Sequence, residues 1–184
     1  QRSTLFPYTT LFRSLLLTGH PEGSMDVGML RYFGIPGQDL VWRWVSPEGD
    51  TALTGPHSTM AKSAADAARR WGRRRNANEC FGCCGPEGIQ WAFSADDMKW
   101  MLDWLFVRGT NLIIPHAFYY SLDGSIRYGE RPPDAGPNNI WWSAYPRITA
   151  YIRRMSWLRT DSRERATVAV LCQEDWVPWR IVAP

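Results

Sequence analysis

The stretch from Ser94 to Pro115 constrains the fold more than any other part of this sequence. Ser94 and, three residues later, Asp97 form a capping-box pattern that starts a helix, with Asp in place of the usual Glu or Gln. Gly109 ends the helical pattern, and an apolar run follows at residues 111–115. Such an unbroken run is typical of a strand buried on both faces of a parallel sheet. The helical spacing is carried by apolar residues: Met98, Met101, Leu102, Leu105 and Phe106.

A second helix and an extended segment precede that unit. Residues 58–71 have a helical pattern that Ser58 or Thr59 can cap, and Gly72 follows as a C-cap. Residues 73–79 then form a short extended segment that ends at Glu79. The helix face that we expect to be buried contains Met60, Ala64, Ala67 or Ala68, and Trp71.

The flanking segments continue the alternation. Residues 26–32 are predicted as a short strand that runs into a turn-rich loop at residues 33–39. A helix is predicted over residues 142–159, with Pro146 in its first turn, where proline is tolerated. Residues 166–171 (ATVAVL) are predicted as another buried strand. The apolar side of the last helix contains Tyr145, Ile148, Ile152, Met155 and Leu158.

Alternating strands and helices predict the α/β class with parallel strands. Functional side chains in such folds collect at the carboxyl ends of the strands. Glu79 and His116 both lie where a predicted strand ends. They are therefore the first candidates for a site.

Composition narrows the classes of function. Hydrophobic residues make up 45% and charged residues 21%, which is ordinary for a globular protein, and the net charge of +3 gives no general attraction to nucleic acid. No apolar run approaches the ~20 residues that a membrane-spanning helix needs. The sequence contains eleven Trp, and about half of them would suffice for a Trp-rich core. The others fit a cleft whose aromatic rings bind the flat faces of sugars.

Glu79 suits one of the two carboxyl roles in glycosidic bond cleavage. One carboxyl group protonates the leaving oxygen, and the other acts as base or nucleophile. Glu79 follows an extended segment, and Phe81 and Gly82 let the chain turn away from it. The alternative is a solvated loop carboxylate that pairs with a nearby arginine.

Several motifs resemble a known family. Together they are similar to large multi-domain barrel glycosidases of the α-L-rhamnosidase and β-galactosidase-like type, over residues 26–171. The most specific part is residues 111–121. The motifs are NECFG at 78–82, DMKW at 97–100, DWLFVRG at 103–109, NLIIPHAFYYS at 111–121, RPPD at 131–134 and YIRR at 151–154.

The resemblance implies a partial TIM (β/α)8 barrel, formed by its last strands and helices, and assigns site residues. Glu79 closes the seventh strand as general base or nucleophile, beside the substrate-binding Asn78. The eighth strand brings His116, Tyr119 and Tyr120 to the sugar site. Further contacts come from the sixth-strand loop, with Asp39 and Trp42. The resemblance also places the partner carboxylate upstream of these residues.

The resemblance further implies an oligo- or polysaccharide substrate of plant or microbial origin. No metal or other cofactor is required, although calcium is a candidate ligand of the intact enzyme. A secreted or periplasmic location is expected, and neither nucleic acid nor a membrane is an expected partner. The chain departs from the family where Asp66 replaces a common His, and where residues 82–86 replace an aromatic or aliphatic stretch. The sugar is therefore left open.

Three segments with different origins are expected. Residues 2–14 (RSTLFPYTTLFRS) are similar, letter for letter, to a translated sequencing adaptor, so residues 1–14 are set aside as an artefact. Residues 15–162 then correspond to the last part of the barrel. Residues 163–184 would begin a following flavodoxin-like α/β domain. A chain that holds only the last strands of a barrel is expected to be insoluble or inactive alone, because its apolar edges are unpaired.

Other chemistries remain as alternatives. Cys80, Cys83 and Cys84 are spaced like part of a zinc site, but no second paired motif supplies the remaining ligands, so buried or free thiols are the simpler interpretation. A Cys80 nucleophile with His116 as base lacks a recognisable elbow. The arginine run at residues 69–75 is either a nucleic-acid patch or favourable charge at a helix C-terminus. A carbohydrate-binding protein without catalysis is the main competing function.

Overall fold

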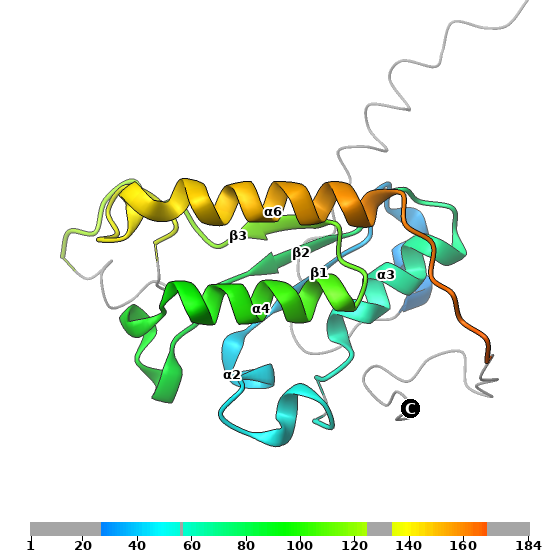
Figure 1. The fold of residues 1–184 in the computed structure, drawn as a ribbon, viewed down its shortest axis with the longest axis horizontal. Coiled ribbons are helices and arrows are strands. Elements are labelled where there is room, and N and C mark those ends of the chain that lie inside the picture. The colour runs from blue at the N-terminus through cyan, green and yellow to red at the C-terminus, as the bar shows by residue number, and fades with distance from the viewer. Residues whose placement is uncertain (1–26, 56, 125–133, 169–184) are drawn as a thin grey trace, which may run out of the picture.

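The computed structural model describes residues 27–55, 57–124 and 134–168. They form a mixed α/β fold around a parallel sheet (Figure 1). The strands are β1 (Gly37–Leu40), β2 (Ala77–Cys80) and β3 (Leu112–Pro115), and the α-helices are α2 (Trp42–Val45), α3 (Met60–Arg70), α4 (Ala95–Val107) and α6 (Tyr145–Thr160). Short 3-10 helices are η1 (Val27–Tyr32), η2 (Asp50–Ala52), η3 (Pro86–Gly88), η4 (Gln90–Ala92) and η5 (Trp142–Ala144).

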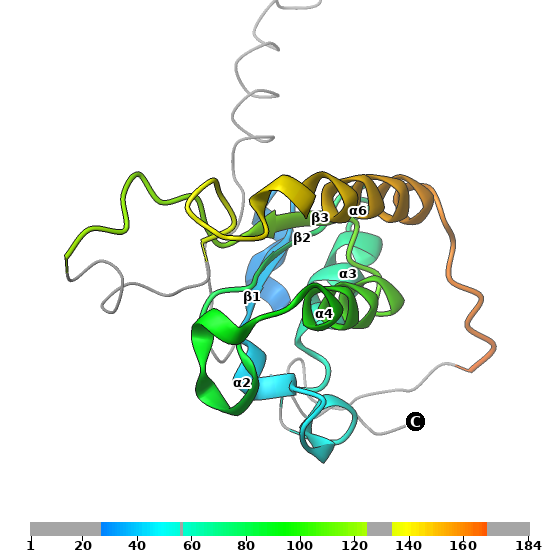
Figure 2. The ribbon, with the colours of Figure 1, turned by 60° about the vertical axis from the view of Figure 1, so that its left-hand side comes forward.

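The sheet has the order β1-β2-β3, with β2 central, and both pairings are parallel. A helix connects each strand to the next: α3 lies between β1 and β2, and α4 lies between β2 and β3. The predicted α/β class with parallel strands is therefore confirmed. Figure 2 shows α3, α4 and α6 together on one side of the strands.

The two faces of the sheet have different environments. Leu40, Cys80 and Ile113 point to the side of the helices and are at most 8% exposed. They join one core with the apolar side of α4. On the other face, Ile114 is 38% exposed, so the prediction that residues 111–115 are buried on both faces is wrong. The helices of the described part cover one face of β3 only.

The helix α3 begins and ends close to its predicted limits. Thr59 is the N-cap residue, although its side chain makes no capping hydrogen bond. At the other end Gly72 has φ +62°, its N–H donates to the Arg69 carbonyl, and the Arg73 N–H donates to the Ala68 carbonyl. These two bonds form a Schellman motif, as the predicted Gly72 C-cap requires.

The capping box predicted at the start of α4 is confirmed. The Asp97 N–H donates to the Ser94 hydroxyl at 3.2 Å, and the Ser94 N–H donates to the Asp97 carboxylate at 2.9 Å. At its far end Arg108 donates to the carbonyls of Ser58 and Ala52, and its guanidinium lies 3.7 Å from the centre of the Trp104 ring. The helix is thus tied to the segment that leads into α3.

The last helix, α6, also agrees with the prediction. It begins at Tyr145, which is buried, and has proline in its first turn. Leu158, predicted to face the core, is 56% exposed, and Tyr151 packs against the core instead. The helix therefore faces the core with its first half and middle.

The N-terminal part of the fold differs from the prediction. Residues 27–32 form the 3-10 helix η1, whose Leu30 is buried against Ala67 of α3, whereas a strand was expected. The strand β1 instead takes up the end of the segment predicted as a loop, residues 37–39, and extends to Leu40. Pro36 and Gly37 suggested a turn. Proline has no N–H to donate, but at the start of a strand it needs only to accept a hydrogen bond. The Ala77 N–H donates to the Pro36 carbonyl at 2.8 Å.

Several predicted segments lie outside the described residues. These are the adaptor-like residues 1–14, and most of the following domain at 163–184. Of the predicted strand at 166–171, residues 166–168 have no regular structure, and the remainder lies outside the described part. Within the described ranges, no helix combines the length and apolar character needed to cross a membrane.

Two glycines with positive φ give a matched test of this packing. Gly109 has φ +97°, and a Cβ there would lie 2.9 Å from the Ala65 Cβ; Gly72 has φ +62° and open space around it. We expect Gly72→Ala to cost about 1–2 kcal/mol, from backbone strain alone. Gly109→Ala should cost about 1–3 kcal/mol more, from the clash with α3. Urea unfolding of both variants checks this, and equal losses would contradict the close approach of the α4–β3 turn to α3.

Candidate active site

Two carboxylates lie side by side on the face of the sheet that points away from the helices. Asp39 of β1 and Glu79 of β2 are register partners. Side chains alternate between faces along a strand, so both point away from Leu40 and Cys80, which join the helix-side core. Asp39 is 5% exposed and Glu79 is half-buried. Both have interactions within the protein. Each is the third residue of its four-residue strand, close to the carboxyl edge.

The next strand brings His116 to the same edge. The His116 N–H donates to the Cys80 carbonyl at 2.7 Å, which extends the pairing of β2 and β3 by one bond. The His116 ring lies against the turn after β2, since a Cβ on Gly82 would be 3.3 Å from its Cγ. The Tyr119 ring meets it edge-on at a centroid distance of 6.1 Å. Asp39, Glu79, His116 and Tyr119 thus gather at one edge, and we refer to them as the carboxyl-edge site.

Asp134, the last residue of the RPPD motif, fixes the backbone of this region, although no site role was predicted for it. Its side chain is fully buried, and its carboxylate accepts from the N–H groups of Tyr119, at 3.3 Å, and Gly136, at 2.8 Å. The Asn138 side chain donates to the Tyr119 carbonyl at 3.0 Å. The signal available in the sequence is an Asp directly before Ala-Gly-Pro, a pattern typical of a turn held by its side chain.

The loop after β2 carries unusual backbone conformations. Phe81 has φ 80°, Cys83 has φ 54° and Glu87 has φ 53°, a region that residues other than glycine rarely adopt. Each such residue costs on the order of 1–3 kcal/mol and persists only where the surroundings hold it. Phe81 is fully buried against Phe93, with ring centroids 5.3 Å apart. Strain of this kind is typical of functional sites, and here it begins two residues after Glu79.

Three of the sequence-predicted site residues lie elsewhere, two of them in the core. The Asn78 side chain is fully buried on the helix side of β2, on the face opposite to Glu79. Trp42 is 2% exposed and packs edge-on against Phe93 and Trp100, with centroid distances of 5.4 and 5.6 Å. Trp42 is the first residue of α2, and this helix turns the Trp42 ring into the core. The structure therefore does not bring Asn78 or Trp42 to the carboxyl-edge site.

Tyr120 and a group of aromatic rings lie beyond the site. The Tyr120 side chain is fully exposed, and Phe118 is 65% exposed. The Phe118 ring meets Trp142 edge-on at 5.6 Å, and Trp142 stacks on Tyr145 at 5.7 Å. Phe118 and Tyr120 belong to the segment after β3, Trp142 precedes α6, and the buried Tyr145 begins that helix. The rings of Phe118, Tyr120 and Trp142 give this side of the molecule exposed aromatic surface of the kind that sugar rings pack against.

The cysteines near Glu79 are free thiols. Cys80 and Cys84 are fully buried, Cys83 is half-buried, and the Cys84 Sγ lies 3.6 Å from the Met101 Sδ. Burial raises the pKa of the Cys80 and Cys84 thiols well above the ordinary value. Across the described residues, no group of three or more His, Cys, Asp and Glu side chains is arranged to hold a metal ion.

Thiol titration tests this arrangement. In a Cys172→Ser variant, Ellman's reagent should react rapidly with Cys83 only, since the thiolate is the reactive form and the other two thiols are buried and protonated. Cys80 and Cys84 should react only after unfolding in guanidinium. Rapid reaction of two or three thiols in the folded protein would contradict the buried positions.

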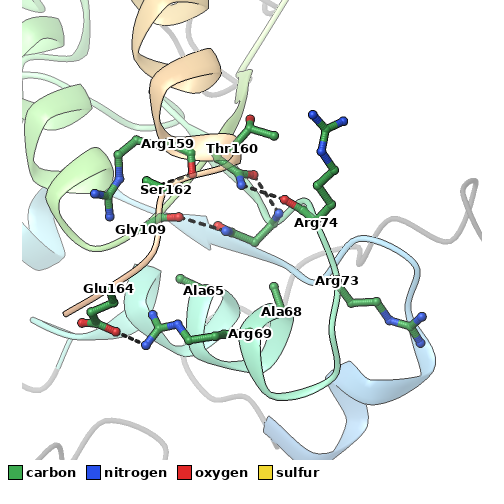
Figure 3. Close-up of a pocket in the computed structure, with 12 residues that line it drawn as sticks. Ala65, Ala68, Arg69, Arg73, Arg74, Gly109, Arg159, Thr160, Ser162 and Glu164 are labelled. Atoms are coloured by element: carbon green, nitrogen blue, oxygen red, sulfur yellow. Dashed lines mark hydrogen bonds and ion pairs between the residues drawn. The ribbon is translucent and has the colours of Figure 1, made fainter. Parts of the chain in front are cut away.

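The arginine run lies at the opposite edge of the sheet. A cavity of about 120 Å³ opens there beside Asn76 and Asn111, which precede β2 and β3. Figure 3 shows the guanidinium groups of Arg73, Arg74 and Arg159 pointing away from one another rather than into a common site. Four arginines of the run contact other parts of the protein. Arg69 forms ion pairs with Asp66 and Glu164, and Arg74 forms one with Asp161. Arg73 donates to the Arg31 carbonyl, and Arg75 donates to the Asn111 carbonyl.

The end of α3 therefore explains much of the arginine run. Arg69 and Arg70 lie in its last turn, where the helix dipole favours positive charge. The two asparagines beside the cavity bond to each other and to neighbouring backbone, with Asn76 donating to the Gly109 carbonyl and Asn111 to the Arg74 carbonyl. These contacts hold the amino ends of β2 and β3 together, which is a structural role.

No family model, no curated protein and no solved structure matches this chain. Function therefore has to be argued from the carboxyl-edge site itself.

Proposed function

We propose that this chain is the last part of the catalytic (β/α)8 barrel of a glycoside hydrolase, with Glu79 as a catalytic carboxylate. The observation that carries the proposal is the position of Glu79. It lies near the carboxyl end of the central parallel strand, on the face opposite to Cys80 and the helix-side core. In a (β/α)8 barrel the helices lie outside, the opposite face of each strand points inward, and active sites form at the carboxyl ends.

Three further features support the proposal. The edge also carries His116 and Tyr119, within reach of the turn that follows Glu79. The loop after Glu79 holds residues with left-handed backbone, as functional loops do. In the described part, β1 and β3 each leave one edge without a strand neighbour, which fits membership of a larger sheet. The substrate class is an oligo- or polysaccharide, and the proposed reaction needs no cofactor.

Binding of iminosugars tests this function without requiring turnover. These compounds carry a protonated amine near the position of the anomeric carbon, where a catalytic carboxylate lies. Calorimetric titration with iminosugars of gluco, galacto, manno and rhamno configuration should reveal at least one that binds the chain. Absence of binding across the panel to folded protein would rule the proposal out.

Sugar binding alone does not separate a hydrolase from a carbohydrate-binding protein without catalysis. The exposed rings of Phe118 and Trp142 favour that second candidate, because they offer a binding surface that involves no carboxylate. The two functions differ in their ligands. A stacking surface should bind neutral oligosaccharides as well as iminosugars, whereas a site built around Glu79 should prefer the cationic compounds.

A further inference from the structure

We propose that the rings of Phe118 and Trp142 bind a neutral sugar unit next to the unit held at Glu79. The substrate is then a chain of sugars rather than a single sugar with a small leaving group. We refer to the two rings as the aromatic platform. The inference rests on the proposed function and extends it to the substrate. Its basis is the exposure of the rings, their packing and their place beside the carboxyl-edge site.

The aromatic platform is exposed although its two side chains are large and apolar. Phe118 is 65% exposed and Trp142 is 38% exposed. Large apolar side chains that gather on a surface mark places where a ligand or a partner binds. The segments that carry them, after β3 and directly before α6, lie side by side beyond the carboxyl end of β3 (Figure 2). In a (β/α)8 barrel the loops at this end build the binding site, whereas neighbouring strands and helices cover the walls.

Contacts within the protein hold the platform in place before a ligand binds. The Phe118 ring meets the Trp142 ring edge-on, with centroids 5.6 Å apart, and Trp142 stacks on the buried Tyr145 at 5.7 Å. Gly136 lies against Phe118, since a Cβ there would come 2.9 Å from the Phe118 Cδ1. A surface whose side chains are already ordered loses less entropy when a ligand binds.

Covalent geometry keeps the platform close to the carboxyl-edge site. Phe118 is two positions after His116 in the chain, and an extended chain advances at most about 3.6 Å per residue. The Cα atoms of these two residues are therefore no more than about 7 Å apart, a separation that a short saccharide spans. A saccharide with one unit at the carboxyl-edge site can thus place a neighbouring unit on the platform.

The chemistry around the rings favours a neutral sugar as the occupant. In the described segments that carry the rings, residues 115–124 and 134–146, there is no Lys or Arg. Nucleic acids and acidic polysaccharides need positive charge for binding, and the exposed Asp123 disfavours them further. Polar groups are present, since Asn138 and Ser143 are exposed. Aromatic walls with a few hydrogen-bonding groups are typical of sites for small neutral ligands, and suit the apolar faces and hydroxyl groups of a sugar.

Calorimetric titration with short and extended iminosugars tests the inference on the full chain. The short probe is the iminosugar of the panel that binds, and the extended probes carry one further neutral sugar unit at either end. One extended probe should bind the wild-type chain about 10-fold more tightly than the short probe does, a gain of the size that aromatic contacts contribute. In Trp142→Ala and in Phe118→Ala the ratio of the two affinities should fall to near one. Glu79→Gln should weaken both probes and keep the ratio.

Trp157→Ala provides the matched control. Trp157 is also exposed, at 77%, but it belongs to the second half of α6. It lies about 18 Å along the helix from Tyr145, at a rise of about 1.5 Å per residue. This variant should therefore keep the wild-type ratio. Circular dichroism and thermal melting establish which variants are folded, and the use of two platform variants keeps the test valid if one of them fails to fold.

The outcomes separate this inference from the proposed function. Equal affinity of the short and extended probes for the wild-type chain would overturn the inference and leave the proposed function intact. A gain that survives in the folded platform variants, or that Trp157→Ala removes as well, would overturn it in the same way. Absence of binding by every iminosugar, short or extended, would instead rule out the proposed function and the inference with it.

Discussion

Glu79→Gln should weaken iminosugar binding by about 10- to 150-fold relative to the wild-type chain. This range corresponds to the 1.5–3 kcal/mol contributed by a hydrogen bond to a charged group. The substitution removes the negative charge beside the ligand amine and keeps the size of the side chain. Where turnover is measurable, kcat/KM should fall at least about 10³-fold, since removal of a catalytic group has effects of that order or larger.

Calorimetry of the paired variants Glu79→Gln and Glu87→Gln measures this effect. The two substitutions are chemically identical and lie eight positions apart in the sequence, but only Glu79 belongs to the carboxyl-edge site. Glu87→Gln should therefore bind the ligand as the wild type does. Equal weakening in both variants would mean that general electrostatics, rather than a carboxylate at the anomeric position, attracts the amine.

Trp42→Ala should be among the most destabilising single substitutions in the described core, with a loss of about 3–5 kcal/mol. Trp42 is almost fully buried, and it contacts Phe93 and Trp100. Its removal would leave a cavity where β1 runs into α2 and would take packing from both neighbours. The loss is comparable to the whole stability of a marginal domain, so we expect the variant to remain folded only with a stabilising ligand or at low temperature.

Trp42→Phe provides the milder test of the same position. It keeps an aromatic ring in the core, so urea unfolding should show a clearly smaller loss than for Trp42→Ala. Iminosugar affinity of the folded Phe variant should equal that of the wild type, because Trp42 does not line the carboxyl-edge site. Weaker sugar binding at unchanged stability would restore Trp42 to the sugar site implied by the family resemblance.

The helices could be predicted from local sequence because their signals lie within a few residues. Ser94 with Asp97 starts α4, and Gly72 ends α3, through contacts between near neighbours in the chain. The exposed Leu158 marks the limit of this reasoning. Helical periodicity gives a face, but the length over which that face is covered depends on what packs against it.

The strands were harder to predict than the helices, because the strands with which they pair are distant in the sequence. The residues of β1 carry turn signals, and only pairing with β2, forty positions later, makes them a strand. The same difficulty affects the site. The sequence places Asn78 and Glu79 together, but the pleat of β2 sends one side chain toward the helices and the other away. Which side faces the site is decided by where α3 and α4 pack.

The pairing of Asp39 with Glu79 follows from register and has no local sequence signal. The resemblance assigned both residues to a sugar site, but their position side by side follows only from the pairing of β1 with β2. Similarly, the hydrogen bonds from Tyr119 and Gly136 to Asp134 connect segments on both sides of a loop. Contacts between segments that are distant in the sequence cannot be predicted from local sequence patterns and are seen only in the folded structure.

Covalent labelling with cyclitol epoxides tests most directly whether Glu79 is the catalytic carboxylate. These sugar mimics place an epoxide at the anomeric position, where a catalytic carboxylate opens it and becomes an ester. A panel of gluco, galacto, manno and rhamno configuration, followed by peptide mass mapping, requires no turnover. The account predicts one ester, on Glu79, prevented by the bound iminosugar. An ester on another carboxylate, or none from the whole panel on folded protein, would contradict it.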